Sequence, residues 1–349
     1  MKIAAVDLFC GVGGLTHGLK LSGIDVLAGY DIDEASKYAY EYNNNACFIN
    51  KDIQELQGQE IRSILDGSDV KILTGCAPCQ PFSSYSNAHK KKKSFDSKWN
   101  LLNSFSRVIN ESNVDIISME NVPELVKETI FADFINNLLE RNYSVTWEIV
   151  NCPDYEIPQN RKRLVLLASK LGEIKLIDPI LKPENYLTVK DAIGKLPKIS
   201  SGEYNVKDRL HYSSKLSEKN IKRIKQSIPG GNWKDWDEDL RLECHRKKSG
   251  NTYKSVYGRM EWNKPSPTIT TQFNGYGNGR FGHPEQDRAL SFREGALLQT
   301  FPIDYKFFEE NKDLPIKKLG IQIGNAVPVL LGKAIGDSIM MHLKKHKSD

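Results

Sequence analysis

The sequence lacks the features of a membrane or secreted protein. No continuous apolar run among its 349 residues approaches the about 18 residues that cross a bilayer, and its six cysteines are scattered along the chain. An acidic side chain, Asp7, comes too early for a secretory signal peptide. We therefore expect a cytoplasmic protein without a membrane partner, whose thiols are reduced and not joined in a disulfide framework.

The chain also has no large excess of charge of one sign, since its net charge is +5. The charge is unevenly distributed, however. Residues 181–260 carry 18 Lys and Arg against 10 Asp and Glu, a net charge of +8, which leaves −3 for the rest of the chain. A polyanion would be attracted to this segment and not to the whole molecule, although a solvated lysine-rich surface would have the same composition.

Short apolar runs alternate with helical patterns through the first half of the chain. Strands are expected at Lys2–Phe9, Asp25–Tyr30, Cys47–Ile49, Val70–Thr74, Val114–Met119, Ser144–Val150 and Leu164–Ala168. Helices are expected at Leu15–Ser22, Glu34–Asn43, Trp99–Glu111, Glu124–Arg141, Ser291–Thr300 and Leu330–His342. Strands separated by helices imply right-handed crossovers, so the pattern predicts an α/β fold with a doubly wound, mostly parallel sheet. Ligands bind such sheets at the carboxyl ends of the strands.

The pattern changes near residue 180, where periodicity weakens and Gly, Pro, Ser, Asn and Lys become more frequent. We therefore expect two domains. The first covers 1–180 and is completed by 303–349, and a second, smaller and irregular domain with a hinge covers 181–302.

A glycine-rich turn, Asp7–Gly14, ends the first strand and opens a helix. Glycines let the backbone approach a ligand, and the helix start offers free N–H groups. The dinucleotide fingerprint is incomplete, because Thr16 stands where its third glycine belongs. Asp31, at the end of the second strand, and Asp52, after the third, could bind ribose hydroxyls and an adenine amine. The combination favours an adenosine-containing cofactor over a tight turn with surface acids.

Two cysteines, Cys76 and Cys79, lie in the loop after the fourth strand. Their spacing would suit a redox pair or half of a zinc site. A zinc site needs two further ligands at motif spacing, and Cys244-His245 is distant, so we expect no metal. A redox pair would normally open a helix. Here Pro78 and Pro81 bracket Cys79 in a strand-end loop, which suits a nucleophile.

These motifs resemble those of the DNA (cytosine-5)-methyltransferase family, of the restriction–modification type, in the family's order and over nearly the whole chain. The matching segments are the turn Asp7–Gly14, Pro78-Cys79-Gln80, Glu120-Asn121-Val122, Gln159–Arg163, Arg293–Pro302 and Gly324–Pro328. The resemblance implies a Rossmann-like domain that uses S-adenosylmethionine and releases S-adenosylhomocysteine. It also implies that residues 181–302 form a target-recognition domain for double-stranded DNA.

The resemblance assigns the chemistry to four residues. Cys79 attacks C6 of a cytosine flipped out of the duplex, so that C5 can take the methyl group. Glu120 protonates or hydrogen-bonds N3. Arg163 lies near the base and this glutamate, and Arg161 steadies the nucleophile loop or a phosphate.

The cofactor residues that it implies are Phe9, Gly11, Gly13, Asp31, Ile32, Asp52, Pro78 and Asn325. The expected DNA-binding residues are Gln80, Ser83, Lys98, Arg223, Arg241, Arg246 and Arg259. Trp233 and Trp236 are expected in a core and not at the DNA. The polar stretch Ser83–Asn100, with Lys90–Lys93, is expected to be a loop that closes over the DNA and meets its phosphates.

The sequence departs from the family pattern at three places. Lys98-Trp99 stands where an Arg is usual, Asp31 where Glu is common, and Glu156 where Gly is frequent. Because Lys cannot make the bidentate contacts of Arg, the loop contact is in doubt. None of these changes removes a catalytic group.

Three alternative functions fit the sequence less well. An amino-methyltransferase uses an (Asp/Asn)-Pro-Pro-(Tyr/Phe) loop, which Asn151–Tyr155 matches only in part. An RNA-directed relative carries a Cys-Phe-Thr signature that this chain lacks, and a non-catalytic homologue would be expected to lose Cys79 or Glu120. We expect a monomer in a prokaryotic cytoplasm, associated with the nucleoid through DNA. A cognate restriction endonuclease would share its target site without needing to bind it.

Overall fold

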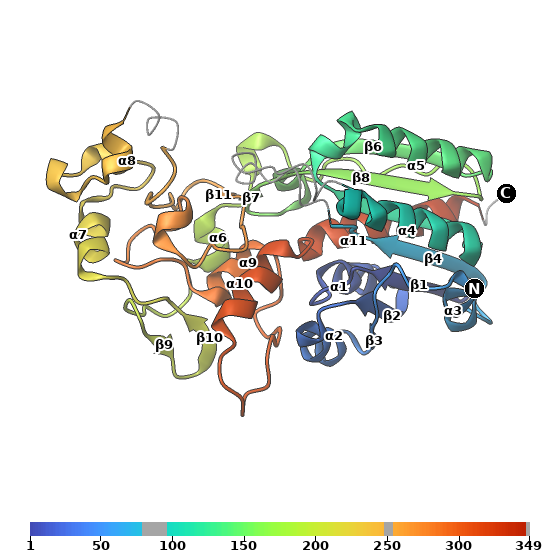
Figure 1. Cartoon of the computed structure of the whole chain (residues 1–349), viewed down its shortest axis with the longest axis horizontal. Helices are drawn as coiled ribbons and strands as arrows, with labels where there is room; N and C mark the ends of the chain where they lie inside the picture. Colours follow the sequence, from blue (N-terminus) through green and yellow to red (C-terminus); the bar gives the residue numbers. More distant parts are fainter. Residues whose placement is uncertain (79–95, 248–253, 347–349) are drawn as a thin grey trace. The chain divides into compact units, whose positions relative to one another are not determined.

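A computed structural model describes residues 1–78, 96–247 and 254–346, and gives only the backbone of residues 96–100. The described chain divides into two compact units (Figure 1). The first unit consists of residues 1–155, 162–180 and 327–349, and the second of residues 156–161 and 181–326.

A seven-stranded sheet forms the centre of the first unit (Figure 1), in the order β3-β2-β1-β4-β5-β8-β6. The strands are β1 (Ile3–Leu8), β2 (Asp25–Asp31), β3 (Cys47–Asn50), β4 (Val70–Gly75), β5 (Ile116–Asn121), β6 (Ser144–Asn151) and β8 (Lys162–Ser169). β1 to β5 are parallel, and β8 is antiparallel to both of its neighbours. The predicted doubly wound, mostly parallel sheet is confirmed. The strand order reverses between β1 and β4, which is where such sheets bind ligands.

Helices cover both faces of this sheet. They are α1 (Gly14–Leu21), α2 (Lys37–Asn44), α3 (Gly58–Ile64), α4 (Asp96–Ser112), α5 (Thr129–Glu140) and α11 (Val329–Lys345). Short 3₁₀ turns occur at Glu34–Ser36, Pro123–Lys127 and Cys152–Tyr155. The helix predicted over Glu124–Arg141 is thus a 3₁₀ turn followed by α5, because Glu128 adopts an extended conformation between them.

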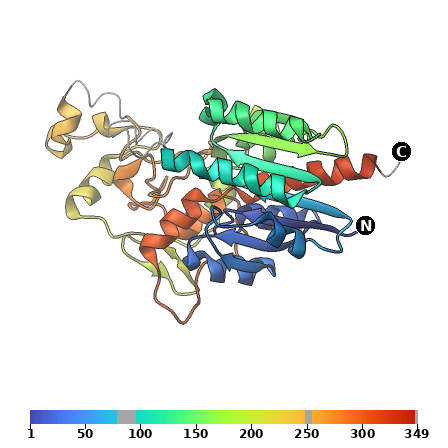
Figure 2. The ribbon, with the colours of Figure 1, turned by 45° about the vertical axis from the view of Figure 1, so that its right-hand side comes forward.

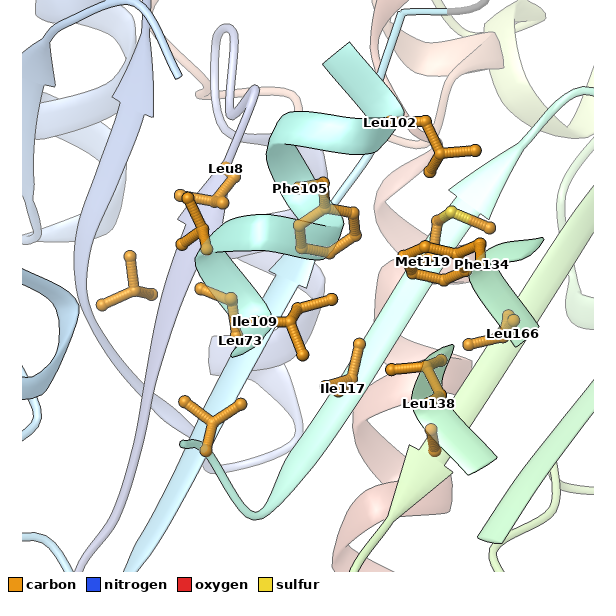
Figure 3. Close-up of a cluster of buried hydrophobic side chains, with 14 of the residues drawn as sticks. Leu8, Leu73, Leu102, Phe105, Ile109, Ile117, Met119, Phe134, Leu138 and Leu166 are labelled. Carbon is orange, nitrogen blue, oxygen red and sulfur yellow. The ribbon is translucent and has the colours of Figure 1, made fainter. Parts of the chain in front are cut away.

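The main core lies between one face of the sheet and helices α3, α4 and α5. Alternate residues of β1 point into it, because side chains alternate along a strand. Figure 3 shows Phe105 of α4 and Phe134 of α5 over Leu73 and Ile117 of the strands. On the other face α1 packs against α11. A side chain at Gly18 would lie 2.3 Å from the Val329 carbonyl oxygen, so only glycine permits this close approach.

The second unit has little regular structure, as its composition predicts (Figure 2). Its helices are α6 (Val189–Ile193), α7 (Glu218–Gln226), α8 (Glu243–Arg246), α9 (Phe292–Leu298) and α10 (Ile316–Asn325). Its strands are β7 (Gln159–Asn160), β9 (Tyr204–Asn205), β10 (Asp208–Tyr212) and β11 (Ser266–Pro267). 3₁₀ turns lie at Pro183–Asn185, Trp233–Asp235, Glu238–Leu240 and Tyr276–Asn278. Trp233 and Trp236 are buried in a local core, which confirms their predicted role.

The two units differ from the expected division at two places, since residues 156–161 and 303–326 belong to the second unit. Glutamine side chains account for both differences. The Gln159 amide donates to the Gln299 side chain at 2.8 Å and to the Leu298 carbonyl at 3.1 Å. The Gln299 amide donates in turn to the carbonyl of Ile323 at 2.8 Å. These buried bonds tie both segments to α9.

One stretch, Ile316–Lys345, is long and apolar enough to cross a membrane by length and composition, but 72% of its apolar window is buried within the structure. It consists of two helices, α10 and α11, that are interrupted before Val329. Burial of this extent is typical of core helices.

Candidate active site at the carboxyl edge of the sheet

The glycine-rich turn after β1 is built from left-handed backbone conformations. Phe9, Gly11 and Gly13 have φ values of 60°, 49° and 87°. The N–H of Gly13 donates to the Cys10 carbonyl at 2.9 Å, which closes the turn immediately before α1. A Cβ atom at Gly11 would meet no atom of the described residues within 4 Å, so these residues leave the space above Gly11 open. The turn therefore leaves room for a ligand against its backbone.

Asp31, the last residue of β2, is bound to this turn. One carboxylate oxygen accepts a hydrogen bond from the Gly11 N–H at 2.8 Å, and the other accepts one from the Asp33 N–H at 2.8 Å. Burial raises the pKa of Asp31, and these backbone N–H groups oppose the shift. Each oxygen keeps a lone pair for a further donor. Ile32 follows with 71% of its surface exposed, an apolar group beside a polar one.

Asp52 follows β3 and belongs to the same edge of the sheet. Its carboxylate accepts hydrogen bonds from the Gln54 N–H at 2.9 Å and from the Gln54 side chain at 3.3 Å. The strand ends of β2 and β3 are joined by Asn50, whose side chain donates to the carbonyls of Asp31 and Ile32, each at 3.0 Å.

A buried carboxyl that the sequence analysis did not single out, Asp7, lies one residue before the end of β1. The Thr16 hydroxyl donates to it at 2.7 Å and lies 3.1 Å from the Tyr40 hydroxyl. Burial raises the pKa of Asp7 to about 7, against the effect of the Thr16 hydrogen bond. No cationic side chain of the described residues offsets this burial. Asp7 is thus able to change charge near neutral pH, directly behind the glycine turn.

Glu120 and Arg163 meet at the ends of two neighbouring strands. Glu120, on β5, is only 2% exposed, and Oε1 lies 2.8 Å from Arg163 Nε on β8. Because β5 and β8 are antiparallel, with Glu120 opposite Val165, Arg163 reaches the glutamate from two positions away. Oε1 makes no hydrogen bond of good geometry within the described part of the chain, so this contact is an ion pair alone. The predicted proximity of Arg163 to Glu120 is present.

The strand end of β4 carries the loop that leads to Cys79. The Cys76 thiol donates to Oε2 of Glu120 at 2.8 Å, and the Asn121 side chain donates to the Ala77 carbonyl at 3.0 Å. The Cys76 N–H donates to the Leu8 carbonyl of β1 at 3.3 Å. Residues of β1 and β5 therefore fix the loop as far as Ala77, one residue before the exposed Pro78.

Several predicted residues lie outside the described part of the chain or are described only in part. Cys79, Gln80 and Ser83 fall outside it, and for Lys98 only the backbone is described, within α4. The prediction of a loop over Ser83–Asn100 is wrong for its last five residues, because α4 begins at Asp96.

Two further predicted residues belong to the second unit. Arg161 is buried, and its guanidinium donates to the Ile269 carbonyl at 3.3 Å. Asn325 is the last residue of α10. Their roles toward the nucleophile loop and the cofactor stay predictions.

The four arginines expected at the DNA separate into two kinds. Arg223 and Arg259 are each only 5% exposed, and both donate to backbone carbonyls, Arg223 to Leu240 at 2.8 Å and Arg259 to His283 at 2.9 Å. These two guanidinium groups stabilise the second unit, and we do not propose them as DNA contacts.

Of the other two arginines, Arg246 is exposed and Arg241 is half-buried. Arg246 donates to the Glu238 carbonyl at 2.7 Å, and Arg241 donates to the Lys234 carbonyl at 2.8 Å. A backbone contact through one nitrogen leaves the other nitrogens of the same guanidinium as donors. Composition alone could not separate these residues from Arg223 and Arg259.

No group of three or more His, Cys, Asp or Glu side chains that could hold a metal ion occurs among the residues that the structure describes. The strand-end cluster is instead a set of carboxyls, one guanidinium and one thiol around a glycine turn. Such a set can bind a polyhydroxylated ligand at Asp31 and can hold or move a proton at Glu120.

Comparison with known proteins agrees with this chemistry. Residues 3–341 match the sequence profile of the family described as C-5 cytosine-specific DNA methylase. The chain is 55% identical over 344 residues to the Type II methylase M.HgiDII of Herpetosiphon aurantiacus, covering 98% of this chain and 96% of that protein. It is 30% identical to the Type II methyltransferase M1.HphI of Haemophilus parahaemolyticus, covering 97% of this chain and 87% of that one.

A solved structure shares the fold. It is that of a candidate DNA modification methyltransferase encoded within an Escherichia coli prophage, with a TM-score of 0.72, 22% identity, and coverage of 98% of this chain and 99% of that one.

Proposed function

Because the chain belongs to the C-5 cytosine-specific DNA methylase family and is a DNA cytosine-5 methyltransferase, we propose that it methylates a flipped-out cytosine through a covalent bond between Cys79 and C6. The observation that carries this mechanism is the position of Glu120. It is a buried carboxyl at a strand end, joined through Cys76 to the loop that leads directly to Cys79.

The first unit has the groups that S-adenosylmethionine needs. The backbone of the turn is open above Gly11, and the Asp31 carboxylate is held with lone pairs available for ribose hydroxyls. Exposed Ile32 offers an apolar surface to an adenine, and Asp52 offers an acceptor to its amine. Phe9, Gly13 and Pro78 complete the proposed site of the first unit, and a contribution from Asn325 of the second unit stays a prediction. The bound cofactor supplies an electrophilic methyl group.

The chain's own residues carry the remaining chemistry. Addition of the Cys79 thiolate to C6 places negative charge on the ring at N3, and Glu120 donates a proton or hydrogen bond to that atom. The Arg163 guanidinium keeps the glutamate at this position and adds positive charge beside the developing anion. After methyl transfer, C5 loses its proton to a base such as water, the thiolate leaves C6 as the C5–C6 double bond re-forms, and the glutamate takes its proton back from N3, so neither residue is consumed.

The substrate is DNA, and we propose a double-stranded target from which the cytosine is rotated into the site. Arg241, Arg246, Gln80, Ser83 and Lys98 are the proposed contacts to it, and residues 181–302 the proposed target-recognition segment. The Type II relatives support a role in a restriction–modification system, and we propose that the enzyme acts in a prokaryotic cytoplasm. We propose that it acts as a monomer and shares its target site with an endonuclease.

Covalent trapping tests the mechanism. The protein is incubated with S-adenosylmethionine and DNA in which 5-fluorocytosine replaces cytosine, since fluorine at C5 blocks release of the enzyme. We expect a protein–DNA adduct that survives denaturation, and none with Cys79→Ser. The exposed Cys47, mutated to Ser, is the matched control and should leave the adduct unchanged. Absence of an adduct, or an undiminished one with Cys79→Ser, would contradict the proposed nucleophile.

A further inference from the structure

Glu120 has a second partner that the mechanism above does not use. The Cys76 thiol lies 2.8 Å from Oε2, while Arg163 Nε lies 2.8 Å from Oε1. Both carboxylate oxygens are therefore held, each by a group from a different neighbouring strand. Glu120 itself is 2% exposed, and Cys76 is half-buried.

The sheet register explains why a side chain at position 76 reaches this carboxyl. Gly75 of β4 lies opposite Met119 of β5, so the next residue on each strand, Cys76 and Glu120, are also neighbours. The backbone of Cys76 is fixed on the other side, because its N–H donates to the Leu8 carbonyl of β1. The thiol is therefore held in place by the backbone of two strands.

A thiol suits a carboxyl that must gain and lose a proton. Its S–H group is a weak donor and its sulfur a weak acceptor, and it carries no charge when protonated. It can donate to the carboxylate and, after a small rotation, accept from the carboxylic acid. A lysine or second arginine at this position would instead hold Glu120 permanently ionised.

We propose that Cys76 is a positioning residue, which keeps Oε2 of Glu120 in place in both protonation states while Arg163 keeps Oε1. This inference rests on the proposed function, since it concerns how Glu120 acts on the cytosine. Cys76 forms no bond to substrate and undergoes no redox step. The thiol differs in this from Cys79, which we propose as the nucleophile.

The test compares substitutions at position 76 with and without a donor. Cys76→Ala removes the thiol, Cys76→Val removes it and keeps more of the volume, and Cys76→Ser keeps a donor and acceptor. Single-turnover methyl transfer is measured with saturating DNA and S-adenosylmethionine, and DNA affinity and melting temperature are measured on the same samples. Cys47→Ser is the control for loss of a thiol elsewhere in this unit.

We expect methyl transfer by Cys76→Ala and Cys76→Val to be about tenfold slower, the loss expected for one hydrogen bond to a charged group, with unchanged DNA affinity. Cys76→Ser should recover most of the rate. In a Glu120→Gln background, Cys76→Ala should cause no further loss, because coupled residues are not additive.

Three results would overturn the inference. The first is a wild-type rate of methyl transfer in a folded Cys76→Ala or Cys76→Val variant. The second is a rate for Cys76→Ser as low as that of Cys76→Ala. The third is an equal loss of rate from Cys76→Ala in the wild-type and Glu120→Gln backgrounds. If only one of Cys76→Ala and Cys76→Val folds, that variant decides the matter, and if neither folds, the role of Cys76 is in folding and the inference is wrong. Should the wild-type protein transfer no methyl group to cytosine C5, the proposed function itself fails, which is a distinct outcome.

Discussion

Each unit of the molecule contains a glutamate that is almost completely buried and paired with an arginine. In the second unit, the Glu294 carboxylate accepts a hydrogen bond from each terminal nitrogen of Arg288 at 2.7 Å. It also accepts one from the Ser291 N–H at 2.7 Å. In the first unit, Glu120 has one ion-pair contact with Arg163 Nε and one hydrogen bond from a thiol. Glu294 is thus saturated with strong donors, whereas Glu120 is held by few.

The surroundings explain what each pair can do. Burial alone would raise the pKa of Glu294, but the Arg288 hydrogen bonds and charge outweigh it and lower the pKa to about 2. Ser291 and Glu294 also form a capping box that starts α9. Glu294 is therefore a permanent anion that holds structure. Glu120 has fewer and weaker donors, one ion-pair contact and one hydrogen bond from a thiol, and we propose it as the residue that donates to the base.

The largest effect is expected from breaking the saturated pair. Glu294→Gln leaves the Arg288 guanidinium buried without its counter-charge, which costs about 3–5 kcal/mol of unfolding free energy. Urea denaturation followed by circular dichroism measures this loss. Glu285→Gln, at an exposed ion pair with Lys198, is the matched control and should be almost neutral. A loss below about 1 kcal/mol for Glu294→Gln would remove the contrast.

The arginine of the other pair is expected to act on rate. Arg163→Lys cannot reproduce the planar guanidinium beside Glu120, so methyl transfer should fall by about 100-fold, within the range of one transition-state donor. Unfolding free energy should change by less than about 1 kcal/mol, because Arg163 is partly exposed and its partner retains Cys76. Stopped-flow methyl transfer and urea denaturation are the measurements. A stability loss as large as that of Glu294→Gln would make the two pairs equivalent.

A third buried carboxyl, Asp7, extends the comparison to a group that no arginine or lysine of the described residues pairs with. Burial raises its pKa to about 7, so between pH 4 and 7 the folded state binds a proton that the unfolded state has lost. Its contribution to stability therefore falls as pH rises through this interval. Asp7→Asn removes this titration. Relative to wild type, the unfolding free energy of the variant should rise by on the order of 2 kcal/mol between pH 5 and pH 8.

Denaturation at a series of pH values tests this. His283, whose pKa burial lowers to about 4, makes stability rise with pH in part of the same interval, but its contribution cancels in the difference between the two proteins. A constant difference in unfolding free energy between variant and wild type from pH 5 to pH 8 would show that Asp7 does not titrate in this interval.

The smallest effect is expected at Asp31, whose carboxylate accepts hydrogen bonds from the backbone N–H groups of Gly11 and Asp33. Asp31→Asn removes the charge but leaves one oxygen acceptor, and it should weaken S-adenosylmethionine binding by about tenfold, as expected for loss of a charged hydrogen bond. Isothermal titration calorimetry without DNA measures this. Asp33→Asn, at the neighbouring turn residue, is the control and should bind as wild type. Unchanged binding by Asp31→Asn would remove it from the cofactor site.

Much of the first unit was predictable from sequence, because its strands are short apolar runs that end in polar residues. Asp31 was identified in this way and Glu120 through the family resemblance, and the structure places both at strand ends. Asp7 was passed over as part of the turn, because its burial depends on Thr16 and Tyr40, which follow it by nine and 33 residues. The part played by Cys76 depends on the register of β4 and β5, which composition cannot give.

Prediction failed most clearly in the second unit. The sequence of a polar, basic segment does not show whether an arginine faces DNA or groups of its own unit. Arg259 donates to several backbone carbonyls, and Arg223 donates to the Leu240 carbonyl and lies over the Trp236 ring. α10 was not predicted, because its range includes two glycines, Gly320 and Gly324, which weaken the helical signal. Gly320 packs against the Thr271 carbonyl and Gly324 against the backbone of Thr270 and Thr271, which are tertiary contacts that periodicity does not encode.

The most direct test of the contrast between the two glutamates is the single-turnover methyl-transfer rate of Glu120→Gln, at saturating DNA and S-adenosylmethionine, with urea denaturation of the same sample. We predict a rate at least about 100-fold below wild type and a loss of unfolding free energy smaller than that of Glu294→Gln, because Glu120 is held by fewer donors. A rate within about threefold of wild type, or a fall in rate explained by a stability loss like that of Glu294→Gln, would contradict the assignment of Glu120 as the residue that donates to the base.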